Sequence, residues 1–328
     1  MIGGLLLAAA LAVSVGGPAD DPAYLPVHAA AALATFEAEG VQVTLRRAKH
    51  PAAAMEMLKD DGAAVAVTTA DQAVRGAWAR GVPVRVLVAH RSAPAAALLV
   101  SATHAGRVTG VAALRGQRVG IPGPGTTSYF ALVALLRRQK LGPADLGLVS
   151  LGGTALLTRL ASGELAAAMV EEPWASRAIA SGAATVLVDL RGPEDAVRHL
   201  GGPFYEVASV ARADEKRLGE LESSLVAYTR ALLRVQHWLA TTPAAAVAGR
   251  LPAGLVGDPE RFTARLEAAR AGYAPGGHAT DAGLQATLEM LRGGTPWPVT
   301  LKLEPSGLRE PAFVTAARTA LGPNPPAP

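Results

Sequence analysis

The segment RGQRVGIPGPGTTSYFALVALLRRQKLG, residues 115–142, passes from a strand through a glycine loop into a helix. Residues 117–121 have the pattern of a short buried strand, which the Pro and Gly residues at 122–125 end. The hydroxyl residues at 126–128 can cap the apolar helix that follows from Tyr129. This helix ends in a basic turn and has no acidic residue in its first turn, so its first N–H groups could hold an anion.

The loop GIPGPGTT also fits the phosphate-loop pattern GxxxxGK[ST], except that Thr126 stands in the position of the lysine. That lysine supplies the charge on the terminal phosphates, so the pattern argues against nucleotide binding. A strand-to-helix turn that caps its helix and binds nothing remains the alternative.

The composition indicates an ordinary α/β protein. A chain of 328 residues can form two domains, and 50% hydrophobic residues with 4% aromatic residues predict cores of Ala, Val and Leu. The net charge is +4, but the Lys and Arg residues are scattered and do not alternate with aromatic residues. We therefore expect no nucleic-acid partner.

The chain has no cysteine, which excludes disulfides, thiolate metal sites, a cysteine nucleophile and a lipid anchor on an N-terminal cysteine. Its seven histidines lie far apart, without the spacing of metal ligands. We expect neither a metal nor a cofactor.

Residues 2–15 are apolar over a length too short to cross a bilayer, which needs about 20 residues. They are either the apolar part of a signal peptide within residues 1–12, with Ala10-Leu11-Ala12 as the cleavage motif, or the first strand of the fold. The alternation in residues 11–15 is typical of a strand.

The chain contains an internal repeat. Residues 11–45 and 118–151 both read strand, loop, helix and strand, which is the size of a βαβ unit. Similar segments follow both units, and Gly81 matches Gly182 at a separation of 101 positions. The repeat predicts two similar α/β lobes.

In parallel α/β sheets, ligands bind outside the carboxyl ends of the strands. The repeat therefore nominates loops 18–26 and 68–71 in the first lobe and loops 123–128 and 171–174 in the second. If the lobes face each other, these loops meet across one cleft.

Four segments of the chain, PAYLPVHAAAALATFEAEGVQVTL, LRGQRVGIPGPGTTSYFALVALLRRQKLG, ASGELAAAMVEEPWASRA and REPAFVTAA, carry a resemblance to a known family. The chain resembles the periplasmic substrate-binding proteins of ABC importers in the nitrate, taurine and aliphatic-sulfonate group, which includes thiamine-precursor binding proteins. The resemblance spans nearly the whole chain. It implies a type II periplasmic-binding-protein fold, in which two α/β lobes with a ligand cleft between them are joined by two hinge crossovers.

We place the crossovers near residues 97–101 and 205–211. The expected organisation along the chain is then a possible signal peptide at 1–12, the first part of lobe I at 13–100, lobe II at 101–204, a mostly helical completion of lobe I at 205–322, and a disordered tail at 323–328.

The resemblance implies ligand contacts from both lobes. By motif position, the ligand lies between one group formed by Tyr24, Thr68 and Thr69 and a second formed by Thr126, Thr127, Ser128, Glu172 and Trp174. Asp21 and Gly125, from the same loops, complete the predicted set. The carboxylates of these loops would repel a bare anion, so a zwitterion or a cationic heterocycle fits better than nitrate alone.

We expect an exported periplasmic protein, soluble, monomeric and not lipid-anchored, that captures a small polar metabolite and delivers it to an ABC permease. The candidate ligands are a sulfonate, nitrate, a taurine-like zwitterion and a thiamine-precursor pyrimidine. One alternative is a sensor domain with a regulatory partner. Another is an enzyme that uses Glu172 or Asp21 as general base, but the spacing supports no catalytic set. The cysteine-rich motif of the family's thiamine-pyrimidine synthases is also missing.

Overall fold

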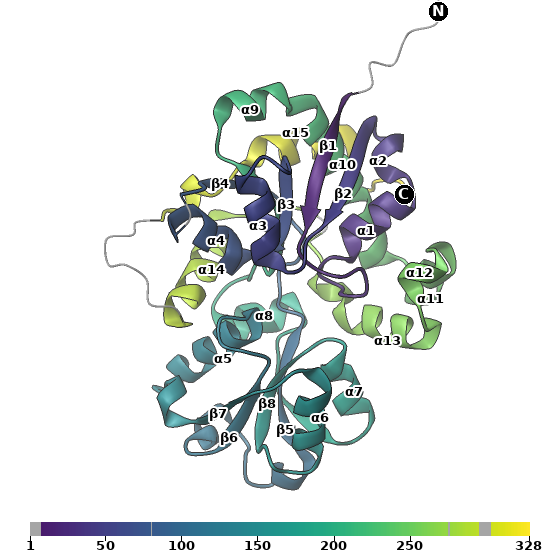
Figure 1. Ribbon diagram of the computed structural model, residues 1–328. Coiled ribbons are helices and arrows are strands. Elements are labelled where there is room, and N and C mark those ends of the chain that lie inside the picture. Colours follow the sequence, from purple (N-terminus) through teal and green to yellow (C-terminus); the bar gives the residue numbers. More distant parts are fainter. Residues whose placement is uncertain (1–7, 80, 275, 295–302) are drawn as a thin grey trace, which may run out of the picture.

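The structure is a computed structural model that describes residues 8–79, 81–274, 276–294 and 303–328. It consists of two α/β lobes, each built on one five-stranded sheet (Figure 1). The strand order is β2-β1-β3-β10-β4 in the first lobe and β7-β6-β8-β5-β9 in the second. The predicted two-lobed fold is confirmed.

The first sheet contains β1 (Ala8–Val15), β2 (Val41–Arg47), β3 (Val65–Thr69), β4 (Val84–Ala89) and β10 (Val207–Arg212). Strand β1 is parallel to β2 and β3, whereas β10 is antiparallel to both of its neighbours. Leu11, Val13 and Val15 alternate along β1 and are all buried. The helices of this lobe are α1 (Leu25–Ala32), α2 (Thr35–Ala38), α3 (Pro51–Lys59), α4 (Ala70–Ala79), α9 (Glu215–Glu220), α10 (Glu222–Thr241) and α15 (Pro311–Leu321).

The second sheet contains β5 (Ala96–Ser101), β6 (Arg118–Ile121), β7 (Gly147–Ser150), β8 (Ala167–Glu171) and β9 (Ala184–Asp189). Its helices are α5 (Thr127–Arg138), α6 (Gly153–Ala161), α7 (Trp174–Ala180) and α8 (Pro193–Leu200). Strand β5 holds the same antiparallel position here that β10 holds in the first sheet. The matched residues Gly81 and Gly182 both have the left-handed backbone, with φ of 63° and 70°. The internal repeat is therefore a repeat of topology.

The crossovers differ from their predicted positions. Residues 97–101 belong to β5, whose six residues are all buried between β8 and β9, and residues 207–211 belong to β10. The segments that join the two sheets are instead residues 90–95 and 190–206. Lobe II accordingly begins at Ala96, because an inserted antiparallel strand takes the place that the sequence pattern suggested for a hinge.

The helices that remain are α11 (Ala244–Arg250), α12 (Ala253–Val256), α13 (Pro259–Ala269) and α14 (Asp281–Gly294), with short 3-10 turns at Ala102–His104, Val111–Leu114, Pro143–Asp145, Arg270–Gly272 and Pro305–Gly307. Helix α14 packs along α5 of the second lobe (Figure 1). A Cβ on Gly294 would overlap the ring of Phe130, which shows how close the two helices lie. The C-terminal part of the chain thus contacts both lobes and does not complete the first lobe alone.

The two ends of the chain also differ from the predictions. Residues 8–12 lie in β1, so cleavage after Ala12 would remove the first half of a paired strand; the rest of the proposed signal peptide, residues 1–7, lies outside the described residues. At the other end, Arg234 of α10 donates to the carbonyl oxygens of Pro326 and Ala327, at 3.2 and 2.7 Å, so the tail is held where disorder was predicted. None of the helices in the described ranges is long and apolar enough to cross a membrane.

Candidate functional site

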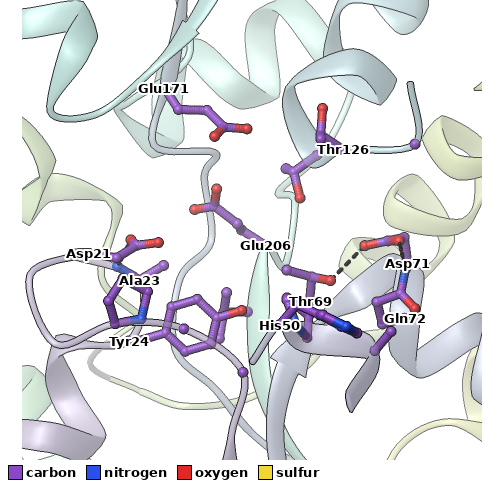
Figure 2. A pocket seen from close by; sticks show the side chains of 18 residues that line it. Asp21, Ala23, Tyr24, His50, Thr69, Asp71, Gln72, Thr126, Glu171 and Glu206 are labelled. Carbon is purple, nitrogen blue, oxygen red and sulfur yellow. Dashed lines mark hydrogen bonds between the residues drawn. The ribbon is translucent and has the colours of Figure 1, made fainter. Parts of the chain in front are cut away.

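A cleft of about 390 Å³ lies between the lobes (Figure 2). All four loops nominated from the sequence contribute to it. The lining residues are Gly16, Gly17, Pro18, Asp21, Ala23, Tyr24, His50, Pro51, Ala52, Thr69, Asp71, Gln72, Gly125, Thr126, Thr127, Glu171, Glu206 and Val207.

Two glycines after β1 shape the wall of the first lobe. A Cβ on Gly17 would overlap the ring of Tyr24, and a Cβ on Gly16 would lie 2.5 Å from Cα of Pro51. Tyr24 is only 4% exposed, and its hydroxyl has no hydrogen-bond partner within the described part of the chain. Figure 2 shows this hydroxyl pointing into the cleft.

The start of α4 adds a second polar group to the same wall. Thr69 Oγ1 and Gln72 Nε2 each donate to the carboxylate of Asp71 at 2.6 Å, and Arg75 Nε lies 3.9 Å from it. Burial raises the pKa of Asp71, whereas these donors act in the opposite direction. His50 caps α3 by accepting from the N–H of Ala53 with Nδ1, so a neutral ring carries its proton on Nε2.

The wall of the second lobe is the loop before α5. Thr126 is the N-cap of that helix: Oγ1 accepts from the N–H of Tyr129 at 3.2 Å and donates to the carbonyl of Gly123 at 2.8 Å. Gly125 has a φ of 81°, a left-handed conformation that residues other than glycine rarely adopt. The predicted cap is therefore present, and its hydroxyl is already engaged by the protein.

The N-terminus of α5 is occupied by a carboxylate of the protein itself. Ser128 Oγ, in the first turn of α5, donates to Oε1 of Glu171 at 2.6 Å. Burial nevertheless raises the pKa of Glu171 above its ordinary value. The position expected to hold the ligand's anion is thus filled by Glu171 at the end of β8.

Two further carboxylates come from the loop after β1 and from the crossover before β10. Burial raises the pKa of Asp21 to about 6; the N–H of Ala23 opposes this shift, and Glu171 adds to it. Glu206 accepts from Nε of Arg91 and from the N–H of Ala95, both at 3.1 Å. Burial raises the pKa of Glu206 to about 8. The charges of Asp21 and Glu171 add to this shift, whereas Arg91 acts in the opposite direction.

The cleft brings together six residues of the predicted set: Asp21, Tyr24, Thr69, Gly125, Thr126 and Thr127. The other four side chains face elsewhere. Thr68 donates to the carbonyl of Pro51 at 3.0 Å, and Ser128 lies behind Glu171. Glu172 is paired with Arg191 at 2.9 Å, with no exposed side-chain surface.

Trp174 begins α7 and packs where a Cβ on Gly153 would overlap its ring, while the guanidinium of Arg177 lies 4.6 Å from its ring centroid. Trp174 is therefore part of the packing between α6 and α7, and its predicted contact with the ligand is not supported by this position.

Sequence reasoning left out several lining residues, among them His50, Asp71, Gln72, Glu171 and Glu206. Asp71 and Glu171 stand in loops that the repeat had nominated, but side-chain direction cannot be read from spacing there. Glu206 is a single carboxylate in the apolar run PFYEVASV, which is the kind of signal that could have identified it.

Solved structures with similar folds include several binding proteins. A protein of Bordetella bronchiseptica RB50 has 23% sequence identity and a TM-score of 0.77, covering 95% of this chain and 98% of that one. The alkanesulfonate-binding protein SsuA from Xanthomonas axonopodis pv. citri, bound to MOPS, has 16% identity and a TM-score of 0.62, covering 94% and 97%. The periplasmic nitrate-binding protein NrtA from Synechocystis PCC 6803 has 12% identity and a TM-score of 0.67, covering 96% and 89%.

At these identities the likeness establishes the fold alone, which agrees with the two lobes and the cleft described above. None of the curated proteins compared with the chain matches it. The family model described as NMT1/THI5 like matches residues 21–246, from the loop that carries Asp21 through both sheets to α11. The resemblance inferred from the sequence is confirmed, and the chain belongs to the NMT1/THI5-like family.

Proposed function

We propose that this protein is the solute-binding component of an ABC importer, which captures a small polar metabolite between its lobes and presents the closed form to a membrane permease. The observation that carries the proposal is the cleft, because its walls come from both lobes. A ligand that contacts both walls binds the closed arrangement more tightly and shifts the population toward it.

The candidate ligands remain a sulfonate, nitrate, a taurine-like zwitterion and a thiamine-precursor pyrimidine. The alkanesulfonate-binding and nitrate-binding proteins with the same fold support a small polar solute. A cleft of about 390 Å³ also lies within the size range of small-molecule sites.

We further propose that the protein is not an enzyme. Of the two general bases considered, Glu172 is sealed in its ion pair with Arg191. Asp21 lies in the cleft, but the hydroxyls held by cleft carboxylates, those of Thr69 and Ser128, donate to groups other than Asp21. These side chains therefore do not form a catalytic set of nucleophile, general base and orienting group.

Export to the periplasm and a monomeric state complete the proposal. The periplasmic nitrate-binding protein NrtA from Synechocystis PCC 6803 has the same fold, which supports the location. Because residues 8–12 form part of β1, the proposal does not include cleavage after Ala12.

Native mass spectrometry of the purified protein tests the proposal. A small molecule that co-purifies, and whose addition to the stripped protein reduces the radius of gyration in solution scattering, is the expected result. A chain that carries no small molecule and keeps its dimensions with every candidate solute would contradict the proposal. The sensor alternative would be favoured instead if deleting the gene left uptake of the identified solute unchanged.

A further inference from the structure

The lining of the cleft contains four carboxylates, those of Asp21, Asp71, Glu171 and Glu206. Asp71 has Arg75 near it, and Glu206 is paired with Arg91, which lies behind it and outside the lining. Asp21 and Glu171 have no cation within ion-pair distance among the residues that the structure describes. The lining therefore holds four carboxyl groups and no Lys or Arg side chain.

Asp21, Glu171 and Glu206 come from three separate segments, the loop after β1, the end of β8 and the crossover before β10. Figure 2 shows Glu171 and Glu206 directed toward each other, with Asp21 beside them. Burial raises the pKa of both Asp21 and Glu206, and the charge of Glu171 adds to the shift in each, as its nearness in Figure 2 leads one to expect. A protein tolerates such a cluster at a cost, unless a cation occupies the space between.

The place where an anion would have bound is closed. At the start of α5 the hydroxyl of Ser128 donates to Glu171, so a carboxylate of the protein itself lies beside the helix N-terminus. A sulfonate or nitrate at this end of the cleft would have to displace Glu171 or lie against it.

The second observation is the hydroxyl of Tyr24. It is buried, it is directed into the cleft, and no atom of the described chain forms a hydrogen bond with it. A buried hydroxyl without a partner is unfavourable in the empty protein, so its presence indicates a ligand that supplies the partner. Burial raises the pKa of Tyr24, and the negative charges of the four cleft carboxylates raise it further, so the phenol stays neutral beside them.

Given the proposed solute-binding function, we infer that the solute is an organic cation of the ammonium or amidinium class, held between Asp21 and Glu171, with a polar atom that bonds to the hydroxyl of Tyr24. Planar N–H groups match carboxylate oxygens on two sides. Among the described residues, no group of three or more His, Asp and Glu side chains is placed to hold a metal ion, which favours an organic cation.

Binding of such a cation should depend on pH. Without a bound cation Asp21 and Glu206 keep protons to about pH 6 and about pH 8, and a cation must displace these protons to bind the ionised carboxylates. Cation affinity should therefore rise with pH between about 6 and 8, and the affinity of an anion should fall. The other charged or titratable groups at the cleft are Asp71, Glu171, His50, Tyr24, Arg75 and Arg91.

Three probes of the same planar shape separate charge from size: benzamidinium is cationic, benzamide is neutral and benzoate is anionic. Calorimetric titration of the full chain with each, in the presence of a metal chelator, should show benzamidinium binding at least about tenfold more tightly than benzamide and benzoate. Its affinity should increase between about pH 6 and pH 8.

Asp21→Asn should weaken benzamidinium about tenfold or more and leave benzamide unchanged, whereas Asp20→Asn, the same change at the exposed neighbour, should leave all three probes unchanged. Benzoate binding as tightly as benzamidinium, or an affinity for benzamidinium that falls with rising pH, would overturn the inference and leave the solute-binding function standing. Failure of benzamidinium to bind would overturn it as well; the function itself is then decided by the co-purified molecule.

Discussion

Glu171 and Glu172 are consecutive carboxylates with different surroundings. Glu171 ends β8, faces the cleft and is held by Ser128, whereas Glu172 lies behind the cleft wall in an ion pair with Arg191. Successive side chains at the end of a strand point to opposite faces, so one position decides between a ligand contact and a structural contact. The sequence EEPW could not distinguish them, and the predicted set contained Glu172 where the cleft contains Glu171.

We expect Glu171→Gln and Glu172→Gln to have opposite effects. Removing the charge of Glu171 should lower benzamidinium affinity about tenfold and leave the free energy of unfolding nearly unchanged or higher. Glu172→Gln should leave the affinity unchanged but destabilise the protein by about 3 kcal/mol or more, because Arg191 then keeps a partly buried charge with one partner fewer. Titration calorimetry and urea unfolding of both variants measure this contrast. Equal effects of the two variants on binding would show that Glu171 and Glu172 are wrongly assigned to the cleft and to the wall behind it.

Tyr24 and Tyr228 are both buried, but only the hydroxyl of Tyr228 has a protein partner in the described chain, Ser209 Oγ at 2.8 Å. Tyr24→Phe should therefore leave the ligand-free protein as stable as before or more stable. It should weaken binding of the natural ligand by about 1 to 3 kcal/mol. Tyr228→Phe should cost about 1 kcal/mol of stability and leave binding unchanged. Thermal unfolding and titration with the co-purified ligand test the pair; a loss of stability in Tyr24→Phe would argue against an unsatisfied hydroxyl.

At the scale of elements, the turn from β6 to α5 was predicted well because its signals are local. The strand was expected at 117–121 and is Arg118–Ile121, and the capping Thr126 stands directly before α5. The break between α1 and α2 was missed, since it occurs at Ala34, which adopts a φ of 52° without being a typical helix breaker. The crossovers were missed because β5 and β10 pair with strands far away in the sequence, and local patterns do not record such pairing.

Thr126→Ala removes the cap of α5 and should cost about 1 kcal/mol of stability. Thr126 Oγ1 also lies 3.0 Å from Ser128 Oγ, so without this contact the donor that holds Glu171 is less well fixed and affinity should change. Asp214→Ala is the matched control, because Asp214 caps α9 through the N–H of Arg217 and lies outside the cleft lining. It should show a similar loss of stability without a change in affinity; a change in both variants would point to a general loosening.

At the scale of the whole molecule, the four nominated loops meet in one cleft, since a repeat of topology places corresponding strand ends on facing edges. Chemical character was harder to predict than location. The sequence indicated a helix N-terminus open to an anion, but a carboxylate from β8 fills it in the folded chain. The charge of a site depends on which side chains the tertiary fold brings together, and spacing within one segment cannot supply that.

Stability should depend on pH in a defined window. Folding raises the pKa of Glu206 from about 4.5 to about 8. Between these two pH values the native state holds a proton on Glu206 that the unfolded chain has released. Below about pH 6.5 the lowered pKa values of His28 and His90 act in the opposite direction, because the unfolded chain binds those protons. Between about pH 7 and pH 8 the ligand-free protein should therefore lose stability, by at most about 1.4 kcal/mol per pH unit, and level off above.

Urea unfolding of the ligand-free protein at a series of pH values measures this slope. Glu206→Gln should flatten it, and Glu172→Gln should keep it, since the carboxylate of Glu172 lies outside the cleft. Stability that increases from pH 7 to pH 8 would contradict the raised pKa of Glu206.

The position of β10 between β3 and β4 sets an order of events during synthesis. A nascent chain that has reached residue 189 already contains every strand of the second sheet, whereas the first sheet lacks its inner strand until residue 212 has been made. The second lobe is therefore expected to fold first on the ribosome, while β3 and β4 wait with unpaired edges that other chains could join. Slowing translation between residues 189 and 212 should lengthen that exposure and increase aggregation of the newborn protein.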